Sequence, residues 1–202
     1  MKRLAPLLAV LLLASCTSSP AASGTKTPAS NVKVDTAALR AQKKAAGIED
    51  CSASTASPAT HGLPDLTLAC LGGGPGVRLS GLRGPAVVNL FAQWCGPCRS
   101  EMPYYQQLHE KAGDKVRVLG VDYLDTQPGL ALELAQQTGV TYPLLADPSG
   151  ALRAPLHVPG LPGMVFVDAQ GQLVGAPHYG VVRSYAELRG LVQDRLHVRL
   201  PS

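Results

Sequence analysis

Two cysteines separated by two residues are the part of this sequence best suited to chemistry. Cys95 and Cys98 follow the apolar run 86–91 and lie beside Trp94, the only tryptophan of the chain. Such a pair can staple a loop as a disulfide, supply half of a metal site, or cycle between dithiol and disulfide. The elements on either side of the pair favour one of these chemistries.

The pattern around the pair predicts a buried strand followed directly by a helix. Residues 86–91 are nearly all apolar, as expected of a strand that is buried on both faces. From Cys95 to Ala112, apolar side chains recur at steps of three and four. Unpaired N–H groups and the positive dipole end at the start of this helix favour a thiolate at Cys95. Cys98 is expected one turn deeper, where a resolving sulfur belongs, and Pro97 suits the first turn because it has no N–H to lose.

The rest of the chain alternates between strand and helix patterns. We predict strands at 64–71, 77–79 and 116–123, a helix from Pro128 to Gly139, a hairpin that joins 164–168 to 173–176, and a last helix after the capping box Ser184–Glu187. The order is βαβα followed by ββα. It predicts one α/β domain at 61–202, with a mixed central sheet and helices on both faces.

The N-terminal sequence MKRLAPLLAVLLLASC predicts an export signal at residues 1–15. Its apolar stretch would span about 16 Å as a helix, short of a bilayer core of about 30 Å. The residues before Cys16 resemble the bacterial lipobox, which implies cleavage and lipid attachment at this cysteine. The alternative is an ordinary signal peptide with a chance cysteine.

Residues 16–60 are predicted to be a flexible tether between the lipid and the domain. Its first part, TSSPAASGTKTPAS, is rich in Ser, Thr, Ala and Pro and poor in large apolar groups. A short helix is expected within it at 34–46. The protein would then be a soluble domain that is held at the membrane by acyl chains.

The cysteine count supports a second disulfide. The chain has five cysteines, and lipid attachment to Cys16 leaves four. Because cysteines outside the cytosol tend to oxidise, we expect Cys51 to pair with Cys70. We interpret this bond as structural, with a stabilisation of about 3 kcal/mol for a loop of this size. The alternative is a redox relay role.

The sequence WCGPC matches the active-site motif of thioredoxins. Its wider context, VVNLFAQWCGPCRSEMP, resembles membrane-anchored, extracytoplasmic thioredoxin-like proteins of the TlpA/ResA/CcmG type. The segments LPDLTL, TYPLLADPSG and GLPGMVFVDAQG continue this resemblance in order over about 61–196. It implies a thioredoxin fold with an extra βα insertion and a short N-terminal strand extension.

The resemblance also implies roles for individual residues. Cys95 would be the nucleophile and Cys98 the resolving cysteine. Pro162 would be a cis-proline facing the sulfurs, a form that X-Pro bonds adopt at low cost. The backbone of Leu161 would then be free to pair with a substrate. Trp94 would shield the sulfurs and contact partners, or serve in packing alone.

Glu101 matches the acidic family position that follows the second cysteine. A partly buried carboxyl there has a raised pKa and would move a proton to or from the Cys98 sulfur. The alternative is a solvated glutamate that pairs with Arg99 or Lys111. The chain also departs from its relatives, since 163–164 is Gly-Met where they often have two hydroxyl residues.

Three other function classes are disfavoured by the sequence. The net charge of +4, or +2 without Lys2 and Arg3, is too mild for a nucleic-acid surface. A metal site needs about four ligands, and the five histidines show no paired spacing. A peroxiredoxin-type peroxidase would have threonine and proline where this chain has Ala92 and Val88. An inert binding module with a stapled Cys-x-x-Cys is the remaining alternative.

We therefore predict a lipid-anchored thiol–disulfide oxidoreductase on the extracytoplasmic face of a bacterial membrane. We expect it to act on exported protein thiols and disulfides without cofactor or metal. Gly96-Pro97 resembles the reducing thioredoxin version, and reduction of apocytochrome c is the leading candidate process. A membrane thiol–disulfide relay protein is the expected electron partner. The alternative is an oxidase or isomerase of exported proteins.

Overall fold

The structure is a computed structural model that describes Met1 and residues 30–202. The remainder of the predicted signal peptide, Cys16 and the first part of the predicted tether lie outside the described residues. Within the described residues, no helix combines the length and apolar character needed to cross a bilayer.

A six-stranded mixed sheet forms the centre of the molecule, with the order β2-β1-β5-β4-β3-β6. Strands β3, β4 and β5 are parallel, whereas β6, β1 and β2 are antiparallel to their neighbours. The strands are β1 (Thr67–Cys70), β2 (Val77–Arg78), β3 (Ala86–Phe91), β4 (Arg117–Tyr123), β5 (Leu144–Asp147) and β6 (Gly163–Val167). The predicted mixed sheet is confirmed.

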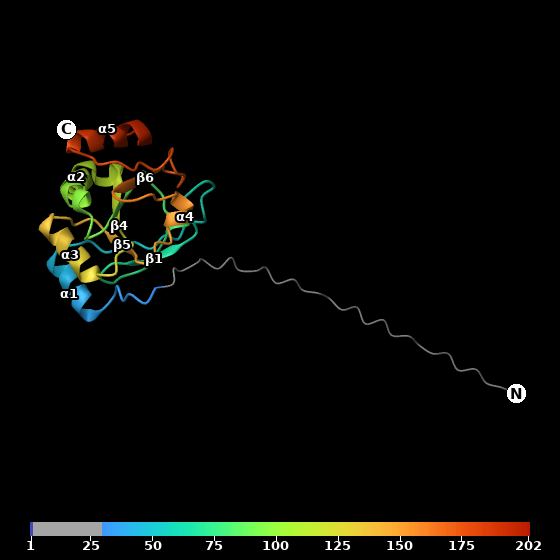
Figure 1. Ribbon diagram of the computed structural model, residues 1–202. Helices are drawn as coiled ribbons and strands as arrows, with labels where there is room; N and C mark the ends of the chain where they lie inside the picture. The colour runs from blue at the N-terminus through green and yellow to red at the C-terminus, as the bar shows by residue number, and fades with distance from the viewer. Residues whose placement is uncertain (2–29) are drawn as a thin grey trace.

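Helices lie on both faces of the sheet, as predicted, but they cover the two faces unequally (Figure 1). Four helices pack into one hydrophobic cluster on one face, whereas a four-residue helix and a 3-10 turn join the cluster on the other face. The first four are α1 (Ala37–Ala45), α2 (Gly96–Ala112), α3 (Pro128–Gln137) and α5 (Tyr185–Leu196), and the others are α4 (Arg153–Leu156) and η1 (Leu79–Gly81). The expected extra βα unit is α3 with β5.

Two strand predictions differ from the structure. Strand β5 was not predicted from the residue pattern, because its four residues Leu144–Asp147 are too few to show a period, and only the family resemblance implied an additional strand. The predicted hairpin partner of β6 at 173–176 is not a continuous strand. It meets β6 through isolated bridges, Val167 with Leu173 and Met164 with His178, which are separated by a bulged stretch.

The packed part of the chain begins earlier than the predicted boundary at residue 61. Helix α1 lies beside α3 and buries Leu39, and Ile48 is buried just after it (Figure 1). Gln42 Nε2 donates to the carbonyl of Gly129 at 2.8 Å, and Glu49 N donates to the carbonyl of Thr141 at 2.8 Å. These few apolar and polar contacts fix a segment whose composition alone resembled a tether.

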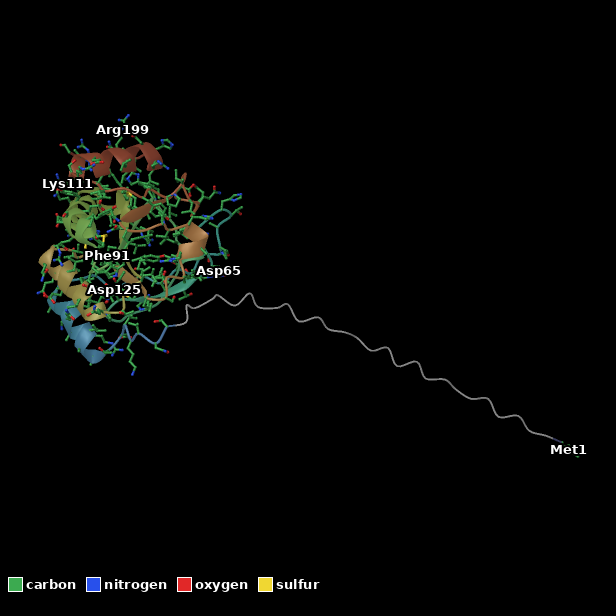
Figure 2. The ribbon with its side chains drawn as sticks, viewed as in Figure 1. Met1, Asp65, Phe91, Lys111, Asp125 and Arg199 are labelled. Carbon is green, nitrogen blue, oxygen red and sulfur yellow. A yellow bond between two sulfur atoms is a disulfide. The ribbon has the colours of Figure 1, made fainter. Side chains whose placement is uncertain are left out.

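Strand β3 positions the cysteine pair. All six of its side chains are buried, and its register places Phe91 opposite Asp122 at the carboxyl end of β4. Phe91 ends β3 and Asp125 follows the end of β4 by two residues, and Figure 2 labels both where these strands lead into the loops before α2 and α3. The Cys-x-x-Cys segment follows β3 at this edge of the parallel strands, where α/β folds usually place their functional groups.

Candidate active site

Cys95 caps the N-terminus of α2, and its sulfur faces the unpaired N–H groups of the first turn. The backbone N–H of Cys98 donates to Cys95 Sγ at 3.2 Å, and Pro97 lies within the first turn. These donors and the helix dipole stabilise negative charge at the Cys95 sulfur. This hydrogen bond arises from local geometry, since the Cys95 sulfur at the N-cap takes the place of the usual capping oxygen.

The structure joins Cys95 and Cys98 in a disulfide. Cys95 is 5% exposed and Cys98 is 1% exposed, whereas Gly96 and Pro97 between them are exposed. The more accessible sulfur is therefore the one at the helix cap. An incoming thiolate reaches Cys95 first and leaves Cys98 in the protected position.

Glu101 lies one turn beyond Cys98 and is 1% exposed, which is deeper than the border position expected from the sequence. Its Oε1 accepts a hydrogen bond from the backbone N–H of Val182, and its Oε2 is buried without a partner among the described residues. Burial raises the pKa of Glu101 to about 7, and the charge of Glu187 adds to this rise, although the Val182 hydrogen bond opposes it. Such a carboxyl can take up and release a proton near neutral pH.

The alternative partners of Glu101 are engaged elsewhere. Arg99 Nη1 donates to Gln137 Oε1 at 2.6 Å, and Lys111 Nζ donates to the carbonyl of Ser202 at 2.9 Å. The solvated, ion-paired glutamate considered from the sequence does not form. Val182 was missed by the sequence analysis, because no local signal marks a backbone N–H that lies far along the chain.

A second buried carboxyl at this edge of the sheet was also missed. Asp122 is 1% exposed, and one of its oxygens, Oδ1, has no donor among the described residues. Burial raises the pKa of Asp122 well above its usual value, and the charge of Asp125, to which it hydrogen bonds, raises it further. The sequence did contain one sign of this buried carboxyl, a single acidic residue at the end of the largely apolar run VRVLGVDY.

Asp125 holds the loops on either side of the site together. Its Oδ2 accepts the N–H of Gln93 at 2.9 Å, and its Oδ1 accepts the N–H of Gln127 at 2.9 Å. Trp94 Nε1 in turn donates to the carbonyl of Leu124 at 3.3 Å. The loop before α2 and the loop before α3 are thus joined by one carboxylate and one indole hydrogen bond.

Exposed apolar side chains directly precede Cys95 and Val182, the residue that hydrogen bonds to Glu101. Trp94 is 55% exposed, and Val181 is also exposed. The peptide bond between Leu161 and Pro162 is cis, and these two residues line a shallow pocket of about 320 Å³ together with Tyr179 and Val181. Exposed aromatic and aliphatic groups beside a buried disulfide suit contact with another polypeptide.

The residues that depart from the family pattern are not on that surface. Met164 is buried, and its Sδ lies 3.7 Å from the hydroxyl of Tyr105. Gly163 lies under the ring of Tyr179, where an added Cβ would come within 2.8 Å of the ring. Glycine and methionine at these positions therefore fill the core beneath the Pro162 loop.

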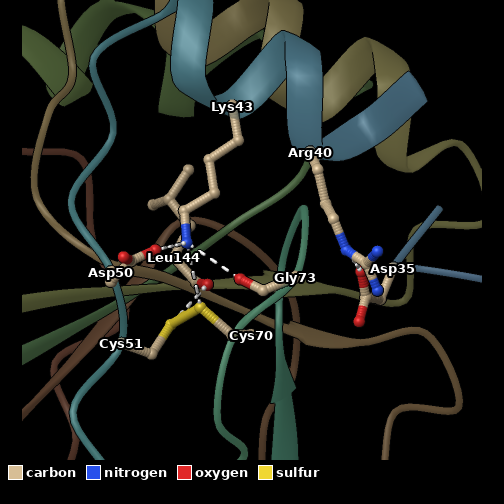
Figure 3. A network of polar contacts seen from close by, with 8 residues as sticks. All are labelled: Asp35, Arg40, Lys43, Asp50, Cys51, Cys70, Gly73 and Leu144. Carbon is tan, nitrogen blue, oxygen red and sulfur yellow. Dashed lines mark hydrogen bonds and ion pairs between the residues drawn. A yellow bond between two sulfur atoms is a disulfide. The ribbon is translucent and has the colours of Figure 1, made fainter. Parts of the chain in front are cut away.

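Cys51 and Cys70 form the second disulfide of the structure, at the end of β1. It connects the segment after α1 to the sheet (Figure 3). Within the described residues, no three His, Cys, Asp or Glu side chains are grouped so that they could hold a metal ion.

Comparison with known proteins agrees with this geometry. Residues 59–176, more than half of the chain, match the model of the AhpC/TSA family. The chain is 32% identical over 115 residues to the thiol-disulfide oxidoreductase ResA of Geobacillus kaustophilus, covering 54% of this chain and 63% of ResA. It spans about half to two thirds of the length of the curated relatives that it matches.

Two solved structures share the fold. One is a secreted Mycobacterium tuberculosis disulfide oxidoreductase homologous to E. coli DsbE, with a TM-score of 0.56 and 26% identity over 63% of this chain and 94% of that one. The other is the exposed lipoprotein thioredoxin Etrx1 of Streptococcus pneumoniae, with a TM-score of 0.51 and 26% identity over 63% of this chain and 97% of that one. The chain therefore has a thioredoxin-like fold and belongs to the AhpC/TSA family, and it is similar to relatives of the ResA and DsbE type.

Proposed function

We propose that this protein is a thiol–disulfide oxidoreductase that is anchored by lipid at Cys16 on the extracytoplasmic side of a bacterial membrane. The observation that carries the proposal is the Cys95 sulfur at the N-cap of α2, where it accepts the N–H of Cys98 at 3.2 Å. The similarity to ResA, to a secreted disulfide oxidoreductase and to a lipoprotein thioredoxin supports it.

In the reducing direction, the Cys95 thiolate attacks one sulfur of a substrate disulfide. The substrate bond breaks, its second sulfur leaves as a thiolate, and a mixed disulfide joins the substrate to Cys95. Cys98 then loses its proton and attacks Cys95 Sγ. The substrate leaves with both sulfurs reduced. Cys95 and Cys98 have given up two electrons and are now joined in a disulfide.

Glu101 is the proton carrier for the second step. Its buried carboxyl has a pKa raised to about 7, so that it exchanges protons at neutral pH. It lies one helical turn past Cys98 and has one oxygen free of hydrogen bonds among the described residues. The carboxylate form would take the Cys98 proton as that sulfur attacks, and would return it when the pair is reduced in the reverse direction.

Reduction of exported protein disulfides is the direction we propose, with the paired cysteines of apocytochrome c as the candidate substrate. Gly96-Pro97 between the sulfurs is the reducing thioredoxin sequence, and thioredoxin has a potential of about −270 mV against about −120 mV for the oxidant DsbA. The electrons would come from a membrane thiol–disulfide relay protein.

Two measurements test the proposal. Cys95→Ser should abolish exchange with a protein disulfide, whereas Cys98→Ser should accumulate covalent mixed disulfides with exported proteins in cells. A Cys98→Ser protein that captures no partner would contradict the exchange mechanism. The reduction potential of Cys95–Cys98, measured against glutathione, decides the direction, since a value near that of DsbA would contradict the reductase.

A further inference from the structure

The second disulfide is about as deeply buried as the first. Cys51 is 3% exposed and Cys70 is 1% exposed, close to the values for Cys95 and Cys98. Burial therefore does not separate a structural bond from a reactive one in this chain. The surroundings of the two sulfurs of Cys51–Cys70 do differ from each other, and that difference has chemical consequences.

Cys70 has a cation beside its sulfur. Lys43, on α1, is 4% exposed, and its Nζ lies 3.4 Å from Cys70 Sγ (Figure 3). The same ammonium donates to the carbonyl of Gly73 at 2.9 Å and to Asp50 Oδ1 at 2.8 Å. A buried ammonium in contact with a sulfur favours its thiolate, because the thiolate carries the charge that the ammonium attracts.

Cys51 has the opposite environment. Its Sγ lies 3.3 Å from the carbonyl oxygen of Leu144 (Figure 3). A carbonyl oxygen repels a thiolate but accepts a hydrogen bond from a thiol S–H. After reduction, negative charge is therefore favoured at Cys70 and a proton is favoured at Cys51.

A pocket next to the disulfide gives an approach from solvent. It has a volume of about 440 Å³ and lies between α1 and the glycine loop 72–74, with Lys43, Ile48 and Asp50 in its wall. Gly74 is exposed, and a Cβ added to it would lie 3.4 Å from Cys70 Sγ. Cys70 is thus separated from this pocket by little more than glycine backbone, and Asp50 and Ser52, the neighbours of Cys51, line a second pocket of about 560 Å³.

We propose that Cys51–Cys70 is a second redox site, which accepts two electrons from the dithiol of another protein, with Cys51 as the attacked sulfur and Cys70 as the leaving sulfur. A donor thiolate attacks Cys51 Sγ, the Cys51–Cys70 bond breaks, and Cys70 leaves as a thiolate beside Lys43. The second donor sulfur then attacks the first, and Cys51 leaves and takes up the proton of that second thiol. The donor ends as a disulfide and this chain as one thiol and one thiolate.

Lys43 is a positioning residue for this step, since it stabilises the leaving sulfur without taking part in bond exchange. A leaving thiol of lower pKa departs faster, and a stabilised dithiol form makes the disulfide a stronger oxidant. An opposite charge in contact with a thiol lowers its pKa. We expect Lys43 to shift the equilibrium with glutathione about tenfold toward the reduced form, which corresponds to about 30 mV.

The equilibrium is measured on the full chain with Cys16→Ser, Cys95→Ser and Cys98→Ser, so that one disulfide remains. After equilibration with glutathione mixtures, free thiols are alkylated and counted by mass, while circular dichroism follows the fold. Lys43→Met should favour the disulfide about tenfold. Lys44 is an exposed neighbour on the same helix, and Lys44→Met should change the equilibrium less than twofold. Lys43→Arg keeps the positive charge, so its equilibrium should stay close to that of the chain with Lys43.

The roles of the two sulfurs are tested by adding either Cys51→Ser or Cys70→Ser to the same chain. The remaining lone cysteine is then alkylated with iodoacetamide across pH. Lone Cys70 should react at lower pH than lone Cys51, and Lys43→Met should remove the difference. Equal pH profiles for the two cysteines would contradict the assignment of the leaving sulfur.

Two results would overturn the second redox site itself. One is a disulfide that is reduced only with loss of the circular dichroism signal, and the other is an equal effect of Lys43→Met and Lys44→Met. These outcomes leave the proposed activity of Cys95–Cys98 untouched, because both of those cysteines are absent from the protein tested. Conversely, an inactive Cys95–Cys98 pair would leave this proposal standing.

Discussion

Glu101 on α2 and Val182 before α5 are joined by a hydrogen bond across 81 residues of sequence. The bond satisfies one oxygen of a fully buried carboxyl, and the other oxygen has no partner among the described residues. A half-satisfied buried carboxyl is more stable protonated than ionised. The helix that begins at the cysteines and the loop before α5 therefore meet at a group that holds its proton up to neutral pH.

The first prediction concerns stability and pH at Glu101. Its pKa is 4.5 ordinarily and about 7 in the fold, so the folded protein binds the extra proton between these values. Stability contributed by this proton is present at pH 4 and is lost as pH rises through 7, by up to about 3 kcal/mol. Glu101→Gln should remove that loss, so that the free energy of guanidinium unfolding falls less between pH 5 and 8 in the oxidised variant than in the unsubstituted protein, and the fall that remains is due to Asp122.

The same substitution should affect exchange. Without the carboxyl, release of the substrate by Cys98 should slow at least tenfold at pH 7, and the inflection of the rate near pH 7 should disappear. Glu110→Gln is the matched control, since Glu110 is exposed on the same helix and bonds only Gln106 among the described residues. A rate profile for Glu101→Gln that still bends near pH 7 would exclude the proton-carrier role.

The second prediction concerns the pair Asp122 and Asp125. Because burial and the charge of Asp125 raise the pKa of Asp122, its ionisation opposes folding as pH rises above 3.8. Asp122→Asn supplies a donor to Asp125 without a charge, so it should increase stability at pH 8. Asp122→Ala should decrease stability, because it leaves Asp125 without that donor and opens a cavity.

Unfolding of the Asp122 variants is best measured in the Glu101→Gln background, so that Glu101 no longer contributes to the pH dependence and the effect of Asp122 can be followed. The emission of Trp94, the only tryptophan, reports at the same time on the loop that Asp125 holds. Equal destabilisation by Asp122→Asn and Asp122→Ala would contradict the hydrogen bond between Asp122 and Asp125.

The third prediction is that Trp94 serves substrate binding more than folding. Its side chain is 55% exposed and, within residues 30–202, makes one hydrogen bond, to the carbonyl of Leu124. Trp94→Ala should raise KM for a protein disulfide several-fold and leave the rate with a small aromatic disulfide nearly unchanged, since a small molecule needs no docking surface. Leu130→Ala, at another exposed apolar residue, controls for loss of surface area.

The fourth prediction concerns Cys16, which lies outside the described residues. If the cysteine carries lipid, Cys16→Ala should move the protein from the membrane or detergent phase to the soluble phase and abolish labelling by a fatty acid. Exchange measured in solution should remain, because the cysteine pair belongs to the folded domain. Unchanged partitioning of the variant would point to an ordinary signal peptide.

The sequence was sufficient for features that depend on local pattern. The buried strand β3, the start of α2 at the cysteines and the capping box before α5 each follow from residues a few positions apart. The helix predicted within 34–46 is found as α1, at Ala37–Ala45. This local pattern was enough to predict that Cys95 and Cys98 lie at a helix N-terminus.

Features that depend on distant contacts were not predictable. The burial of Glu101 depends on Val182, and the burial of Lys43 depends on Gly73 and Cys70. No window of the sequence contains these pairs, and lysine in a polar segment ordinarily indicates a solvated face. Helix α1 was assigned to a tether for the same reason, because its partner α3 is far along the chain.

The edges of the sheet bear on how this protein meets unfolded chains. Along β6, Met164 exchanges backbone hydrogen bonds with His178, and Phe166 accepts one from Val174, so the outer side of that strand is already covered. The opposite edge, β2, has only two residues. An extended polypeptide therefore finds little backbone onto which it could add as another strand, so the edges of this sheet offer little template for aggregation.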